Sequence, residues 1–132
     1  MAEEKQAKFE DLLVDEEEIN EDLLVNTVST YTKIGSESGE LVPQKAYQAL
    51  TAKEKIAVVL LAQKARYELE MVDEEWLSPT EIANLSGIKS GTVFPAVRGL
   101  EEDNYAQNDD GSYRIPTVNI EKTKQFLEGD DE

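Results

Sequence analysis

The strongest hydrophobic pattern along the chain lies in the segment LTAKEKIAVVLLAQKARYELEMV. Its expected inward positions recur at helical spacing along one broad stripe, namely Ile56, Val59, Leu60, Gln63 and Tyr67. Thr51 followed by Glu54 is the sequence signature of a capping box. The pattern therefore predicts a helix over about 52–71, and its Val-Val-Leu-Leu centre makes this the expected core helix.

Two shorter helices are expected directly after the core helix. The string SPTE supplies a serine N-cap at Ser78, a proline in the first turn and a glutamate that completes a capping box. It predicts a helix over about 79–86, which Gly87 ends. Ser90 is the expected N-cap of the next helix, over about 91–103, with Asn104 closing it in a left-handed conformation. The expected core positions of this second helix are Val93, Ala96, Val97 and Leu100.

The remaining elements are shorter. The turn signal NDDG separates two apolar runs, at about 105–107 and 113–115, and predicts a β-hairpin followed by a helix over about 119–127. Near the start, an aspartate N-cap at Asp15 with a glutamate three residues later predicts a helix over about 16–25. The β-branched string TVSTYTKIGSESGELVP then predicts a small hairpin, or one strand and a loop.

The length of 132 residues fits one domain. We expect an acidic flexible arm over 1–14, the folded domain over 15–128 and an acidic tail over 129–132. A long helix, a short helix, a glycine-containing turn, a second short helix and a hairpin follow one another in the order of a winged helix-turn-helix. The expected fold class is mainly α with a small β-hairpin (α+β), of the winged helix-turn-helix type.

The string GTVFPAVRGLEEDNY resembles the recognition-helix stretch of PadR-like winged-helix transcriptional regulators. In that family an aromatic–proline pair sits between small and apolar core positions, and here the pair is Phe94–Pro95. The resemblance covers about 40 residues, from Leu77 to Pro116. It implies the winged-helix fold and double-stranded DNA as a partner. The sequence NDDGSYRI departs from the family, because it encodes a short wing with two acids and one arginine.

The outward face of the helix over 91–103 supplies the candidate DNA-binding residues. If the core positions face inward, the side chains that remain outside can bond phosphates or base edges, and Phe94 can contact a thymine methyl group. The expected reading residues are Ser90, Thr92, Phe94, Pro95 and Arg98, with Lys89 and Arg114 on the DNA backbone. Arg98 has an alternative partner in Glu102, four residues later, and Ser90 has an alternative role as a helix cap only.

The charge distribution argues against a simple DNA-binding surface. The formal net charge is −16, and residues 1–25 hold ten acids against two lysines. Residues 78–116 hold six acids against three bases, which predicts weak or strongly salt-dependent DNA binding. The only basic stretch, 41–67, suggests a basic surface made by Lys45, Lys53, Lys55, Lys64 and Arg66. Two roles are open for the acidic arm: it covers that surface, or it is a solubilising, disordered tail.

The same residues therefore support a second hypothesis. A winged helix can serve as a protein-docking module, because a fold alone does not decide function. In this interpretation the acidic surface and an exposed Phe94–Pro95 pair meet a basic partner within a larger nucleic-acid-processing or ribosomal assembly. Sequence leaves open whether the chain forms a homodimer.

Other classes of function are disfavoured by composition. The chain has no cysteine and no histidine, so thiolate chemistry and the usual acid–base residue near neutral pH are missing. We expect neither an enzyme nor a bound metal or cofactor. The acidic start MAEEKQAKFEDLL is unlike a signal peptide, and no apolar run reaches membrane-spanning length. A cytoplasmic protein without membrane contact is expected.

Overall fold

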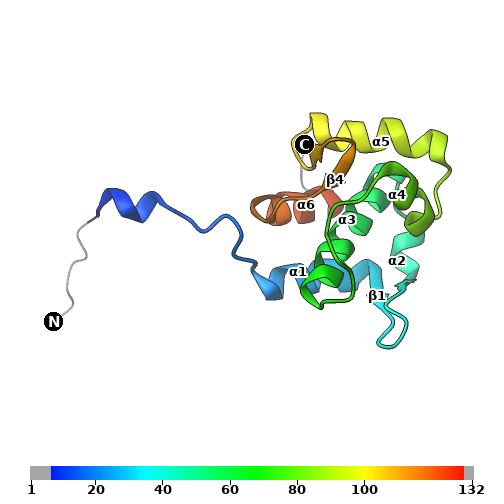
Figure 1. Cartoon of the computed structure of the whole chain (residues 1–132), viewed down its shortest axis with the longest axis horizontal. Helices are drawn as coiled ribbons and strands as arrows, with labels where there is room; N and C mark the ends of the chain where they lie inside the picture. Colours follow the sequence, from blue (N-terminus) through cyan, green and yellow to red (C-terminus); the bar gives the residue numbers. More distant parts are fainter. Residues whose placement is uncertain (1–6, 130–132) are drawn as a thin grey trace.

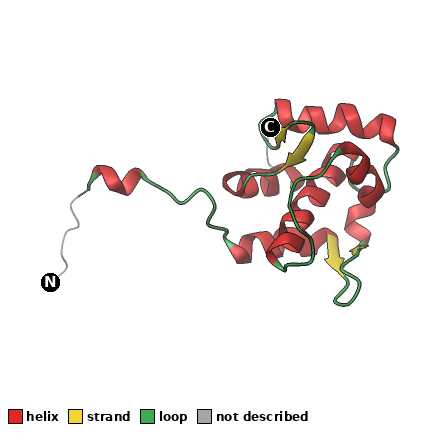
Figure 2. Ribbon diagram, in the orientation of Figure 1, coloured by secondary structure: helices red, strands yellow, loops and turns green. Residues whose placement is uncertain are grey.

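The computed structural model of the chain describes residues 7–129 and has an α+β architecture (Figure 1). Helices and two small antiparallel hairpins, drawn in Figure 2, surround one central helix. The α-helices of this part are α1 (Glu21–Tyr31), α2 (Lys45–Gln48), α3 (Ala52–Glu68), α4 (Pro79–Ser86), α5 (Ser90–Glu102) and α6 (Ile120–Leu127). The strands are β1 (Thr32–Ile34), β2 (Leu41–Pro43), β3 (Gln107–Asp109) and β4 (Ser112–Arg114).

Helix α3 is the centre of the core. Every residue from Ile56 to Lys64 is buried, because α1, α4, α5 and α6 all pack against it. The predicted capping box is confirmed, with the Thr51 Oγ1 accepting from the Glu54 backbone N–H. The helix ends at Glu68, three residues before the predicted end. Glu70 adopts a positive φ of 61° there, and the Met71 N–H bonds the Arg66 carbonyl, which closes the last turn.

Helices α4 and α5 pack against α3 and against each other. The predicted bounds of α4 and its capping box are confirmed. Gly87 follows in the left-handed region with a φ of 79°, a conformation that glycine adopts without steric cost. The tight turn from Gly87 to Lys89 brings the chain back so that α5 lies across the outside of the domain (Figure 1).

The first strand of the hairpin after α5 begins two residues later than predicted. Asp110 and Gly111, both with positive φ, make a two-residue turn, and Asp109 pairs with Ser112 directly beside it. This turn fixes the strands as β3 and β4, whereas the preceding Tyr105 N–H bonds Leu100 O and closes α5. Leu77 pairs with the other edge of β4 through two hydrogen bonds to Tyr113. The hairpin is thereby attached to the segment before α4.

The N-terminal part differs most from the sequence-based expectation. The predicted helix over 16–25 is wrong, because Asn20, not Asp15, caps α1, and the helix continues to Tyr31. Its buried residues, Leu24, Thr27, Val28 and Tyr31, follow helical spacing. β-Branched side chains in TVSTY gave the false strand signal, and packing against α3 outweighed it. The predicted hairpin is confirmed as β1 paired with β2, and the short helix α2 was not predicted.

The segment before α1 extends away from the domain (Figure 1). Phe9 to Leu12 form a short 3-10 helix, and each described residue up to Glu18 is exposed. The expected cover of the basic stretch by this segment is therefore absent from residues 7–18. The predicted arm falls partly on residues 1–6, and the predicted tail on residues 130–132, which lie outside the described part. No helix within residues 7–129 is long and apolar enough to cross a membrane.

Candidate nucleic-acid interface

Helix α5 is anchored by one fully buried face. Val93, Val97 and Leu100 each have 0% of their surface exposed, as the sequence predicted for them, while Ala96 is half-buried. Because a helix has 3.6 residues per turn, burial of these positions turns the residues between them outward. The anchoring explains how a helix at the edge of the domain keeps a fixed orientation.

The predicted reading residues lie together on the outward face of α5. Each of them is exposed, and the set comprises Lys89, Ser90, Thr92, Phe94, Pro95 and Arg98. Phe94 exposes 50% of its surface although it is a large apolar side chain. Phe94, Pro95, Arg98 and Glu102 line an open hollow of about 480 Å³. The structure thus brings the helix-borne candidates onto one continuous surface.

The prediction that Ser90 is the N-cap of α5 is wrong. Lys89 occupies the N-cap position, Ser90 is the first helical residue, and no side chain caps the helix. In the turn before it, the Ser86 hydroxyl accepts from the Ile88 N–H at 3.2 Å. The Thr92 and Val93 N–H groups already bond the Lys89 carbonyl. The N–H groups of Ser90 and Gly91 are therefore the ones left for an external acceptor.

Arg98 is held by no ion pair within the described residues 7–129. The alternative pairing with Glu102 is not formed, although both side chains border the same hollow. An exposed guanidinium without a partner inside the fold keeps its donors for an external ligand. Lys89 is likewise exposed and stands just before the helix.

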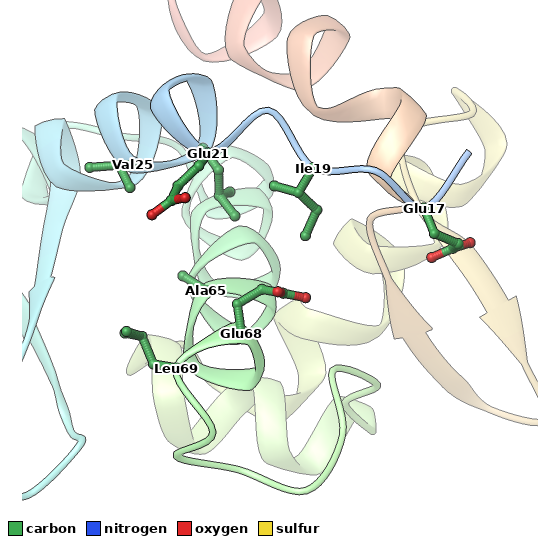
Figure 3. A pocket seen from close by; sticks show the side chains of 8 residues that line it. Glu17, Ile19, Glu21, Val25, Ala65, Glu68 and Leu69 are labelled. Carbon is green, nitrogen blue, oxygen red and sulfur yellow. The ribbon is translucent and has the colours of Figure 1, made fainter. Parts of the chain in front are cut away.

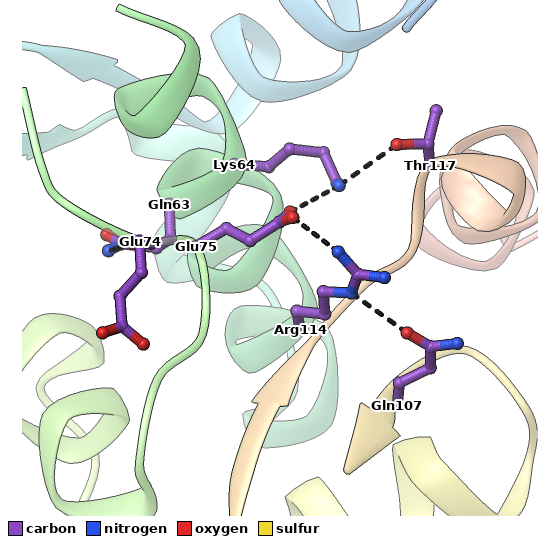
Figure 4. Close-up of polar contacts among 7 residues, drawn as sticks. All are labelled: Gln63, Lys64, Glu74, Glu75, Gln107, Arg114 and Thr117. Carbon is purple, nitrogen blue, oxygen red and sulfur yellow. Dashed lines mark hydrogen bonds and ion pairs between the residues drawn. The ribbon is translucent and has the colours of Figure 1, made fainter. Parts of the chain in front are cut away.

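Arg114 is engaged inside the fold and is not placed as the sequence led us to expect. Its Nη1 lies 2.6 Å from the Glu75 Oε2, and its Nε donates to the Gln107 Oε1 at 3.0 Å (Figure 4). Its guanidinium also lies 4.7 Å from the Trp76 ring centre. These contacts point the side chain toward α3, away from the tip of the hairpin. The expected contact of Arg114 with a DNA backbone would require breaking them.

The prediction that Lys64 belongs to an exposed basic surface is wrong. Only 1% of its surface is exposed, and its Nζ lies 2.6 Å from the Glu75 Oε1 and 3.3 Å from the Thr117 Oγ1 (Figure 4). Lys64 belongs to the same helical stripe as Ile56 and Leu60, and this spacing could have predicted its burial. A buried ammonium needs a carboxylate, so Glu75 was the partner to look for nearby.

The other residues of the proposed basic surface do not form one patch either. Lys53 pairs with Asp103 at 2.5 Å, and Lys55 lies 5.4 Å above the Tyr47 ring centre. The Arg66 Nη1 donates to the Gln63 Oε1 at 2.9 Å. Lys45, on α2, is exposed. The local excess of positive charge is thus spread over different sides of α2 and α3 and is partly neutralised.

The hairpin tip carries negative charge. Asp109 and Asp110 are exposed there, and Asn108 accepts from the Gly111 N–H at 3.0 Å to fix the turn. Across residues 7–129 no group of histidine, cysteine, aspartate or glutamate residues has a metal-binding arrangement. The chemistry of this surface is consequently that of hydrogen-bond donors, one aromatic ring and a few cations beside carboxylates.

The chain was compared with family models, curated proteins and solved structures. No family model, no curated protein and no solved structure matched it.

Proposed function

We propose that this protein is a winged helix-turn-helix transcriptional regulator that inserts α5 into the major groove of double-stranded DNA. In support, the order α3, the β-bridge at Leu77, α4, α5 and the β3–β4 hairpin matches the order expected of a winged helix, in which α5 would be the recognition helix. The observation that carries the proposal is the outward face of α5, which is exposed along its first half while Val93 and Val97 anchor the opposite face.

Each exposed group has a specific role in this proposal. Arg98 donates to a guanine edge, and the Ser90 and Thr92 hydroxyls bond base edges or phosphates. The Phe94 ring packs against a thymine methyl group. A phosphate oxygen accepts from the open N–H groups at the start of α5, where the helix dipole also favours an anion.

The electrostatics set the expected strength of binding. One copy presents Lys89 and Arg98 near the exposed face of α5, while Asp109 and Asp110 at the hairpin tip repel phosphates. Few phosphate contacts give low affinity, because release of counterions supplies much of the free energy of DNA binding. We propose that two copies bind adjacent half-sites, which doubles the number of contacts.

The test is selection of genomic DNA fragments by the full chain at low and at moderate salt. Wild type is compared with Arg98→Ala and with Lys33→Ala, because Lys33 is an exposed lysine on β1, outside the α5 face. We expect Arg98→Ala to lose roughly tenfold in affinity and to relax the selected sequence at one position. Lys33→Ala should select the same fragments as wild type. Failure of the wild type to enrich any fragment at low salt would reject the proposal.

A second candidate function is protein docking through the same face. The half-exposed Phe94 borders a hollow with Pro95 and Arg98, while Arg114 is occupied and the hairpin tip is acidic. These features suit a basic partner within a nucleic-acid-processing or ribosomal assembly. Fragment selection by the wild type separates the two functions. A docking module selects no DNA fragment, and Phe94→Ser should abolish its binding to a reconstituted protein partner.

A further inference from the structure

A groove lies between the start of α1 and the end of α3 (Figure 3). In the fold, these two helix ends lie away from α5 (Figure 1). It encloses about 380 Å³. Its floor is apolar and is made by Ile19, Leu24, Val25, Ala65 and Leu69. Val25 exposes 52% and Leu69 58% of its surface, so two large apolar side chains of the groove lie open to water. We call this site the α1–α3 groove.

The rim of the α1–α3 groove is acidic. Glu17, Glu21 and Glu68 line it, and no lysine or arginine does (Figure 3). A second hollow, of about 490 Å³, shares Glu17, Ile19 and Glu68 with the groove and adds Asp73 and Glu74. The two cations of that second hollow, Lys64 and Arg114, are both paired with Glu75. The field over the whole strip is therefore negative.

The extended N-terminal segment continues this surface. The residues Leu13, Val14 and Ile19 line a third hollow, which connects the segment with the groove. Phe9 exposes 90%, Leu12 79% and Leu13 77% of its surface, at the two ends of the short 3-10 helix and directly after it. Such a large exposed apolar group is unusual unless another surface covers it.

We propose that the α1–α3 groove together with residues 9–14 docks a cationic amphipathic helix of a partner protein. An apolar helix face fits the groove floor, as in helix-in-groove recognition, and lysines or arginines beside that face meet the glutamates of the rim. Residues 9–14 then fold over the docked helix and bury Phe9, Leu12 and Leu13.

Charge selects this occupant over the alternatives. The same surface on a second copy carries the same glutamates, and DNA and anionic lipid are also negative, so each is repelled. The segment from Phe9 to Asp22 contains eight acids and no base, which disfavours its docking into the groove of another copy. This inference does not depend on DNA binding by α5, because the two surfaces use separate elements.

The experiment uses the full chain and a synthetic helix of leucine and lysine, with leucine at i, i+3, i+4 and i+7, carrying a fluorophore. Two matched probes are a scrambled peptide of identical composition without an apolar face, and a peptide with glutamate in place of lysine. Fluorescence anisotropy is expected to give at least tenfold tighter binding of the patterned cationic helix than of the scrambled peptide. Equal binding of both cationic peptides would reduce the interaction to nonspecific charge attraction and overturn the proposal.

Variants locate the binding site. Leu69→Ser and Val25→Ser remove exposed groove residues, so folding should persist, and each is expected to weaken the patterned helix about tenfold. Val118→Ser is the control, because Val118 has the same 58% exposure as Leu69 and does not line the groove. Unchanged affinity in Leu69→Ser and Val25→Ser, with circular dichroism showing the wild-type fold, would exclude the groove.

Discussion

At the scale of single residues, Glu75 links three parts of the molecule. Its two carboxylate oxygens hold Lys64 of α3 and Arg114 of β4, each at 2.6 Å, and Lys64 also donates to Thr117 before α6. The side chains are largely buried, with 2% of Lys64 and 12% of Glu75 exposed. A buried cation of this kind depends on its partner, because removal of one charge leaves the other unpaired in a poorly solvated site.

We predict that Glu75→Gln lowers the free energy of unfolding by about 3 kcal/mol. The control is Glu74→Gln, since the Glu74 carboxylate is exposed and forms none of the contacts drawn in Figure 4. Urea unfolding followed by circular dichroism measures both variants. The double variant Lys64→Met with Glu75→Gln should regain part of the loss, because the buried charge is gone. Equal midpoints for Glu75→Gln and wild type would contradict this account of the pair.

Tyr47 provides a prediction on pH. Burial raises the pKa of its hydroxyl to about 12, and this hydroxyl donates to the Ser86 carbonyl at 2.9 Å. In the unfolded chain the group ionises near its usual value of about 10, so the unfolded state loses its proton first. The stability from Tyr47 is thus complete below about pH 10 and declines as the pH rises toward 12. Tyr47→Phe should show a shallower decline between these values in urea midpoints, and an identical slope would contradict the assignment.

At the scale of elements, the sequence predicted best where local signals and tertiary packing agree. The capping boxes at Thr51 and Ser78 and the positive φ at Gly87 fix α3, α4 and the turn before α5 within the chain itself. The predicted start of α1 was wrong because two candidate N-cap residues, Asp15 and Asn20, lie close together there. Burial against α3 decided between them, and sequence patterns do not contain that contact.

In the candidate site too, the sequence predicted what local patterns determine and missed what tertiary contacts determine. The outward face of α5 was predictable from helical periodicity alone, since Val93 and Val97 define the inward side. The engagement of Arg114 was not predictable, because it depends on Glu75 and Trp76, which reach it only in the folded chain. Charge counts along the sequence likewise missed the burial of Lys64, as they ignore which side of a helix each lysine occupies.

Pro95 gives a prediction for α5. It lies inside the helix, where it has no N–H to donate to the Gly91 carbonyl, and its ring is exposed to solvent. We predict that Pro95→Ala raises the free energy of unfolding by about 1–3 kcal/mol, because the missing bond forms and no core contact is lost. Thr92→Ala, on the same exposed face, should change stability by less than about 0.5 kcal/mol. Thermal unfolding measures both variants. A lower stability of Pro95→Ala than of wild type would contradict this prediction and show that Pro95 stabilises the fold.

On the scale of the whole molecule, two functional surfaces are proposed on separate sides of the domain. The α5 face holds Lys89 and Arg98, which form no ion pair within residues 7–129, whereas the N-terminal segment and the α1–α3 groove hold a concentration of glutamates. Under the proposed function, this separation would let a chain of net charge −16 approach DNA, since the acids need not face the phosphates. Because few phosphates are contacted and salt also screens the remaining repulsion, we expect affinity to fall less steeply with salt than it does for a basic DNA-binding surface.

A DNA complex with amide-resolved NMR spectra tests the central claim most directly. The isotope-labelled full chain is titrated with a short duplex of the selected sequence and, as a control, with a scrambled duplex of equal composition. We predict that the largest chemical-shift changes fall on residues 89–98 for the selected duplex, and that Arg98→Ala removes the difference between the two duplexes. Changes centred on α2, or equal changes with both duplexes, would contradict the assignment of α5 as the helix that binds DNA.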